Sequence, residues 1–126
     1  SAVLQQPIGK SDDNLALRQA SFRSWTEGLI AQGRHLDPQV MHAVERNLFH
    51  RDFVYSVSRD FVSSCTTPLL VLPGNDARHP KAIGEEIAAL APNAQMFADW
   101  ETPDGQRRYR QVLQDFFKQH NETTGR

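Results

Sequence analysis

Cysteine is nearly absent from this chain: Cys65 is the only one among 126 residues. A single thiol cannot form a disulfide within the chain or build a cysteine-rich zinc site, so both of those scaffolds are excluded. Long apolar runs are missing too, since none approaches the ~18 residues that a membrane-spanning helix needs. The opening SAVLQQPIGK lacks the basic and long apolar regions of a signal peptide. We therefore expect a soluble, cytoplasmic protein that does not contact a membrane.

An excess of charge of one sign is also missing. The chain has 14 Lys and Arg residues against 15 Asp and Glu, a net charge of −1. Proteins that bind nucleic acid through bulk positive charge carry a basic excess or stripe, so we expect no nucleic-acid partner. The arginines at 107, 108 and 110 fall on the solvated face of a predicted helix and do not change this expectation. The length is that of one domain, residues 1–126.

Three short apolar segments predict β-strands. The strongest is PLLVLPG at 68–74, an unbroken apolar run bounded by prolines. Such a run without alternation is typical of a parallel strand that is buried on both faces. Residues 2–4 and 95–98 are the weaker candidates.

Apolar residues at helical spacing, together with capping residues, predict five helices. The first is capped by Ser11 or Asp12 and carries Phe22, Trp25 and Ile30 on one side. The five predicted helices span residues 12–33, 37–48, 53–65, 80–90 and 103–117. The element order is strand, three helices, strand, helix, strand, helix, which implies parallel crossovers. We expect an α/β fold with a short parallel sheet of about three strands and flanking helices.

The loop after the strongest strand, Gly74-Asn75-Asp76-Ala77-Arg78-His79-Pro80, contains the best candidate site. Function gathers at the carboxyl ends of parallel strands, and this loop lies there, just ahead of a helix. Asp76 is placed to orient a histidine and stabilise its imidazolium, and an imidazole exchanges protons near neutral pH. The alternative is that Asp76 only caps the turn and that His79 is solvent-exposed.

The segment PLLVLPGNDARHPKAIGEEIAALAPNAQ resembles the strand-seven, acid-loop and helix segment of α/β-hydrolase-fold proteins. AVLQQPIG is similar to the preceding strand six of that fold, and residues 12–64 stand where the family inserts a helical cap. The resemblance implies a partial α/β-hydrolase fold, with residues 1–9 and 65–126 as its sheet-and-helix core. It implies that Asp76 is the catalytic acid of the triad. His79 stands, with Pro80, at a position where some members of the family have the dipeptide His-Pro, and it is the second candidate catalytic residue.

Two departures from the family bear on activity. No serine lies in the G-x-S-x-G elbow that carries the family's nucleophile, and the loop at 98–104 has no histidine where the family's triad histidine is expected. One hypothesis is that the chain is the C-terminal portion of a hydrolase. It would then act on an ester- or amide-type small substrate only when the missing N-terminal half is present. The alternative is a non-catalytic binding or oligomerisation module on a hydrolase-like scaffold. In either case we expect the chain alone to be inactive.

The remaining titratable residues form no recognisable motif. His35, His42, Glu45 and His50 lie close in sequence, but no HExxH pattern occurs among them. Their spacing straddles the predicted helix break between Gly33 and Pro38, so no single helix face carries all of them. We therefore expect no metal and no cofactor. Cys65 is expected to be a small buried thiol.

The first predicted strand suggests self-association. In the hydrolase fold, strand six is paired on both sides, so the missing half would leave residues 2–4 as an open edge. Two copies can pair such edges about a two-fold axis, and we therefore expect a homodimer through the first strand.

Overall fold

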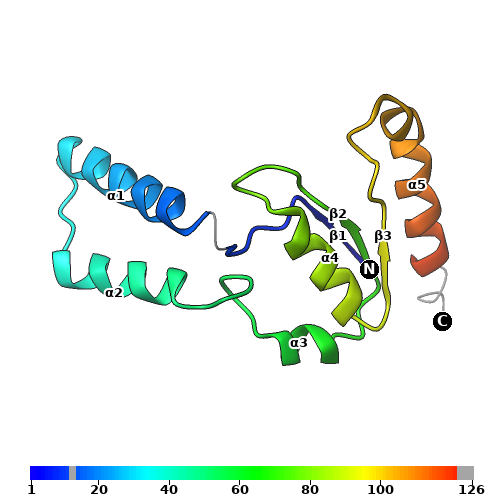
Figure 1. The fold of residues 1–126 in the computed structure, drawn as a ribbon, viewed down its shortest axis with the longest axis horizontal. Helices are drawn as coiled ribbons and strands as arrows, with labels where there is room; N and C mark the ends of the chain where they lie inside the picture. The colour runs from blue at the N-terminus through cyan, green and yellow to red at the C-terminus, as the bar shows by residue number, and fades with distance from the viewer. Residues whose placement is uncertain (12–13, 122–126) are drawn as a thin grey trace.

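The fold was derived from a computed structural model, which describes residues 1–11 and 14–121. In these two ranges, three strands and five helices follow one another in the predicted order (Figure 1). The strands are β1 (Ala2–Gln5), β2 (Leu69–Leu72) and β3 (Ala94–Met96). The helices are α1 (Leu15–Ala31), α2 (Pro38–Phe49), α3 (Arg59–Ser64), α4 (Lys81–Leu90) and α5 (Pro103–Asn121).

The three strands form one parallel sheet in the order β1–β2–β3, which confirms the predicted α/β class. Leu70 in the central strand lies opposite Val3 on one side and Gln95 on the other. All four residues of β2 are buried, as expected for an unbroken apolar run with neighbours on both faces. The sheet therefore presents the carboxyl ends of all three strands at one edge.

One helix covers each face of the sheet, and the two lie on either side of the strands in Figure 1. On one face, Val71 packs in a cluster with Ile83 and Ile87 of α4. On the other face, Leu72 packs in a second cluster with Phe116 of α5. These two apolar layers fix the central strand, and with it the loop that begins at its end.

The hairpin of α1 and α2 projects away from the sheet in Figure 1. The two helices pack on each other, with the rings of Phe22 and Phe49 6.1 Å apart, and neither helix contains a fully buried residue. Trp25 and Ile30, which we expected on the packed side of the first helix, are 56% and 57% exposed. That expectation is wrong because, among the described elements, α1 packs chiefly against α2, which leaves these two side chains in solvent.

The cap of α1 also differs from the prediction. The helix begins after Asn14, while Asp12 lies outside the described residues. Asn14 is fully buried, and its side chain donates to the carbonyl of Gly9 at 2.9 Å and accepts from the amide of Ser11 at 2.9 Å. These bonds fix the chain's turn out of the sheet into the helical region.

The helix predicted over residues 53–65 is shorter than expected. Phe53 and Val54 are buried in irregular backbone, and Val54 forms an antiparallel bridge with Gly9. The helix begins only at Arg59, where the Ser58 hydroxyl caps it by accepting from the amide of Phe61 at 3.2 Å. The apolar spacing that suggested a longer helix comes from side chains that enter the core from a loop.

Within the described ranges 1–11 and 14–121, no helix combines the length and the apolar character that crossing a membrane requires.

Candidate acid–histidine site

The candidate site is the loop that leaves the carboxyl end of the central strand. The loop folds back on itself so tightly that the backbone of Gly74 meets that of His79. A Cβ on Gly74 would lie 2.3 Å from both the Cβ and the carbonyl oxygen of His79, so only glycine fits. The amide of His79 closes the turn by donating to the Asp76 carbonyl at 3.2 Å. This closure places the acid and the imidazole side by side.

The Asp76 carboxylate and the His79 ring are in direct contact. Nδ1 of His79 lies 3.0 Å from both Oδ1 and Oδ2 of Asp76. An ionised carboxylate only accepts hydrogen bonds, so Nδ1 carries a proton and its N–H donates a hydrogen bond to the carboxylate of Asp76. Nε2 is then the ring nitrogen that can exchange a proton with a bound group.

The same carboxylate also closes the turn. Oδ1 of Asp76 accepts from the main-chain amides of Arg78 at 2.7 Å and His79 at 2.8 Å. The hydrogen bond from the His79 side chain, followed by that from the His79 amide, holds the pKa of Asp76 below its ordinary value. Both sequence interpretations of Asp76, as a partner of His79 and as a turn cap, therefore describe contacts that the structure contains.

Solvent reaches the two side chains to different extents. The side chain of Asp76 is 56% exposed and that of His79 is 25% exposed. Water therefore screens the charge of Asp76, and the ion pair formed when His79 is protonated stabilises the fold only weakly. The imidazole is the more enclosed of the two groups.

Arg18 contacts this loop from a part of the chain that the sequence analysis did not connect with it. From the first turns of α1, its guanidinium donates a hydrogen bond to the carbonyl of Arg78 and lies over the ring of Tyr55, 5.5 Å from the ring centroid. Burial raises the pKa of the Tyr55 hydroxyl, and the positive charge of Arg18 opposes that rise. Arg18 thus links the helical region directly to the loop that holds Asp76.

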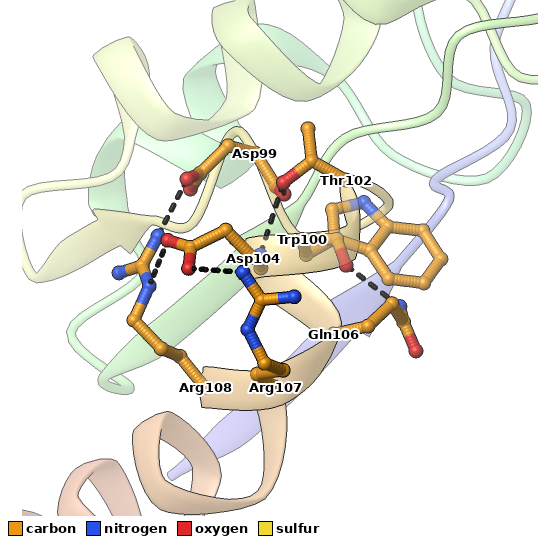
Figure 2. A network of polar contacts seen from close by, with 8 residues as sticks. Asp99, Trp100, Thr102, Asp104, Gln106, Arg107 and Arg108 are labelled. Carbon is orange, nitrogen blue, oxygen red and sulfur yellow. Dashed lines mark hydrogen bonds and ion pairs between the residues drawn. The ribbon is translucent and has the colours of Figure 1, made fainter.

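The turn between β3 and α5, where the resemblance led us to look for a histidine, contains Trp100 (Figure 2), which is buried. Nε1 of Trp100 donates to the carbonyl of Pro73 at 2.7 Å, which ties the end of β3 to the end of β2. Gln106 donates to the Trp100 carbonyl at 2.6 Å, and the Thr102 hydroxyl caps α5 by accepting from the amide of Gly105 at 3.0 Å. This turn holds the strand ends together.

Ion pairs reinforce the same turn on its solvent side (Figure 2). Arg108 pairs with Asp99 at 2.5 Å and with Asp104 at 3.2 Å, and Arg107 pairs with Asp104 at 2.9 Å. The side chain of Arg108 also lies over the ring of Phe97. These arginines are on the exposed face of the helix, as predicted, and their charges are directed at acidic neighbours.

Three other residues singled out in the sequence, His42, Glu45 and His50, line one hollow of about 320 Å³ on the helical hairpin. In the described part of the chain, no group of three or more His, Cys, Asp or Glu side chains could hold a metal ion. Cys65 is half-buried, whereas we expected a buried thiol, because it ends the short helix α3 at the rim of an apolar groove.

A small hollow lies next to the acid loop, between the ends of β2 and β3. It has a volume of about 160 Å³, and its lining includes Gly74, Asn75 and Lys81 on one side and Asp99 and Glu101 on the other. Its mixture of charged and main-chain groups suits a small polar molecule better than an extended apolar one.

A scan of protein-family models, a search of curated proteins and a search of solved structures gave no match to this chain.

Proposed function

We propose that Asp76 and His79 are the acid and base of a hydrolytic site of the α/β-hydrolase type. In this proposal the chain is the C-terminal portion of a protein that hydrolyses an ester- or amide-type small substrate. A polypeptide segment outside these 126 residues provides the nucleophile. The observation that carries the proposal is the pair of 3.0 Å contacts between His79 Nδ1 and the two carboxylate oxygens of Asp76.

The arrangement of the elements supports this proposal. The chain runs through a strand, a helical insertion, a second strand with an acid at its end, a helix, a third strand and a last helix. The three strands are parallel neighbours in one sheet. Helices α4 and α5 cover opposite faces of the sheet. The sequence resemblance implies the same order of elements, and in this proposal the hairpin of α1 and α2 acts as the cap.

In the proposed mechanism, Nε2 of His79 takes the proton from a nucleophilic hydroxyl as its oxygen bonds to the substrate's carbonyl carbon. Asp76 stabilises the imidazolium that results and keeps the ring in the orientation observed. His79 then gives the proton to the leaving group as its bond to the carbonyl carbon breaks. A water molecule, deprotonated by Nε2 in the same way, then bonds to the acyl carbon. The bond from that carbon to the nucleophile's oxygen breaks, the oxygen takes the proton back from Nε2, and the acyl group leaves as the free acid. Donors for the oxyanion come from the segment that provides the nucleophile.

The test compares two aspartates that make the same main-chain contacts. Asp37 caps α2 by accepting from the amides two and three residues ahead, as Asp76 does in its loop. Only Asp76 also contacts an imidazole. In the polypeptide that carries the nucleophile with these residues, Asp76→Asn should lower kcat by about 10⁴-fold, the loss known for a triad aspartate. Asp37→Asn should leave kcat unchanged.

Two results would count against the proposal. An Asp76→Asn protein with unchanged kcat would reduce Asp76 to a turn cap. Turnover of p-nitrophenyl esters by the purified 126-residue chain would show that the outside nucleophile is not needed.

The second candidate is a non-catalytic binding or oligomerisation module on the same scaffold. It is favoured by the β3–α5 turn, where the buried Trp100 holds the strand ends together at the place expected for a triad histidine. It is also favoured by the two main-chain bonds of Asp76, which account for an aspartate at this position without any catalysis. No turnover of ester or amide substrates by the polypeptide that carries these residues, together with a loop that Asp76→Asn destabilises, would select this candidate.

A further inference from the structure

Hydrogen bonds hold the peptide bond between Arg78 and His79 at both of its ends. Its N–H, which belongs to His79, donates to Oδ1 of Asp76 at 2.8 Å. Its carbonyl oxygen, which belongs to Arg78, accepts from the guanidinium of Arg18. A peptide unit is planar, so bonds at its two opposite ends restrict the rotation of the whole plane. Asp76 and Arg18 together therefore fix the direction in which the His79 side chain leaves the main chain.

The main chain of Arg18 is anchored close to the same loop. Its amide donates to the Asn14 carbonyl at 3.0 Å, and the buried Asn14 side chain bonds in turn to the carbonyl of Gly9. Gly9 lies directly against Ile83 of α4, because a Cβ on Gly9 would come within 2.7 Å of the Ile83 Cδ1. Helix α4 is the element that follows the loop at 74–80. The base of the Arg18 side chain is thus held to the helix that continues from this loop.

The ring of Tyr55 orients the guanidinium of Arg18. The guanidinium lies over that ring, 5.5 Å from the centroid, and the ring packs edge-on against Phe49 with 5.6 Å between the centroids. A planar guanidinium can lie on an aromatic face while the N–H groups at its edge remain free to donate. Tyr55 therefore helps to direct the donors of Arg18 at the Arg78 carbonyl.

A second attachment of the loop matters because Asp76 is open to water. The side chain of Asp76 is 56% exposed. Water competes for the hydrogen bonds of an exposed carboxylate, so these bonds alone hold the loop weakly. The bond from Arg18 acts at the other end of the same peptide bond, and its charged donor makes it stronger than a bond between neutral groups.

We infer that Arg18 is a positioning residue for His79. By holding the Arg78 carbonyl, it keeps the imidazole turned so that Nδ1 faces Asp76 and Nε2 is left to exchange a proton. The catalytic meaning of this inference rests on the proposed function, in which Nε2 is the base. Arg18 acts only through the main chain of the loop. In this way α1 is joined to the site that it helps to cap.

The first test measures the tautomer of the neutral His79 ring by ¹⁵N NMR in the 126-residue chain. Arg18→Met removes the donors and keeps an unbranched apolar side chain. We expect the ring proton, held on Nδ1 in the wild type, to be shared between both ring nitrogens in this variant. Arg23→Met is the matched control, since Arg23 also belongs to α1 but pairs with Glu45 of α2 at 3.0 Å. It should leave the proton on Nδ1.

Urea unfolding of the same variants separates positioning from stability. An Arg18 that only fastened α1 would lower the unfolding midpoint when replaced and would leave the tautomer of His79 unchanged. If Arg18→Met does not fold by circular dichroism, Arg18→Gln takes its place. Its polar end is solvated but its side chain is shorter, so it too should release the Arg78 carbonyl and share the ring proton between the nitrogens.

The second test measures kinetics in the polypeptide that carries the nucleophile. Arg18→Met should lower kcat and kcat/KM together by about 10- to 100-fold, because a misplacement of about 1 Å costs on the order of 10²-fold. Arg23→Met should leave both constants unchanged. The loss in Arg18→Met should be smaller than that in Asp76→Asn, because the acid and the imidazole are both still present.

Two results would overturn the role of Arg18. One is an Arg18 variant that folds and keeps the His79 proton on Nδ1. The other is an Arg23→Met protein whose ring is disturbed as much as that of Arg18→Met, since the effect would then come from a general loosening of the hairpin. Failure of the proposed function looks different: kcat is then unchanged in Asp76→Asn. Normal kcat in Arg18→Met together with lowered kcat in Asp76→Asn would overturn only the role of Arg18.

Discussion

The clearest consequence of the structure for stability concerns the indole hydrogen bond at the ends of β2 and β3. Trp100 is 7% exposed, and its Nε1 donates to the carbonyl of the buried Pro73 at 2.7 Å. Trp100→Phe keeps an aromatic ring at this position but removes the donor. The Pro73 carbonyl is then left buried without that hydrogen bond.

A buried acceptor that loses its partner costs about 1–3 kcal/mol in the free energy of unfolding. The smaller ring adds to this loss, because it fills less of a site that is packed against Leu70, Leu72 and Phe116. Urea unfolding slopes of small domains are about 1–3 kcal/mol per molar, so the midpoint should fall by roughly 1 M. The second tryptophan, Trp25, provides the control because it is 56% exposed.

The assay is equilibrium urea unfolding followed by circular dichroism at 222 nm. Trp25→Phe should change the free energy of unfolding by less than about 0.5 kcal/mol, as exposed positions usually do. A Trp100→Phe protein as stable as Trp25→Phe would refute the reasoning, since the bond to Pro73 would then contribute nothing.

Two further predictions concern the turns at the carboxyl edge. A Cβ on Gly105 would lie 1.9 Å from the Asp99 carbonyl oxygen, whereas one on Gly28 would meet nothing within 4 Å. Gly105→Ala should therefore lower the melting temperature, while Gly28→Ala, in the interior of α1, should raise it slightly, and equal melting temperatures would contradict this. Since the folded-state pKa of Asp76 is lowered, its contribution to stability is present above its ordinary pKa of 3.8 and is lost as the pH falls through the folded value. In acid titrations of stability, wild type and Asp76→Asn should therefore converge at low pH, and a constant difference between them would exclude the contribution.

The sequence predicted the sheet better than it predicted the helical region. The unbroken apolar run between two prolines predicted the buried parallel strand β2. Asp37-Pro38 predicted the start of α2, through an aspartate cap and a proline at the first helical position. The prediction that a helix begins at Phe53 was wrong, because apolar periodicity does not distinguish a helix from a loop that inserts side chains into the core. The cap at Ser58 was the local signal of the later helix start.

The candidate site was partly visible in the sequence. Asp76 and His79 are three residues apart, so a single turn can join them, and the loop's place after a buried strand was predictable. The contribution of Arg18 was not, because it reaches a carbonyl sixty residues away and no local pattern encodes that contact. The same applies to the Trp100 indole, whose partner lies 27 residues earlier in the chain.

The tautomer of His79 shows whether Asp76 orients the imidazole for catalysis, and ¹⁵N NMR measures it, with the ring signals assigned by comparison with His79→Gln. We expect the neutral ring to carry its proton on Nδ1, where both oxygens of Asp76 lie 3.0 Å away. Asp76→Asn should move that proton toward Nε2, and Asp37→Asn should leave it in place. A wild-type ring protonated on Nε2, or an Nδ1 proton that Asp76→Asn does not displace, would contradict the account.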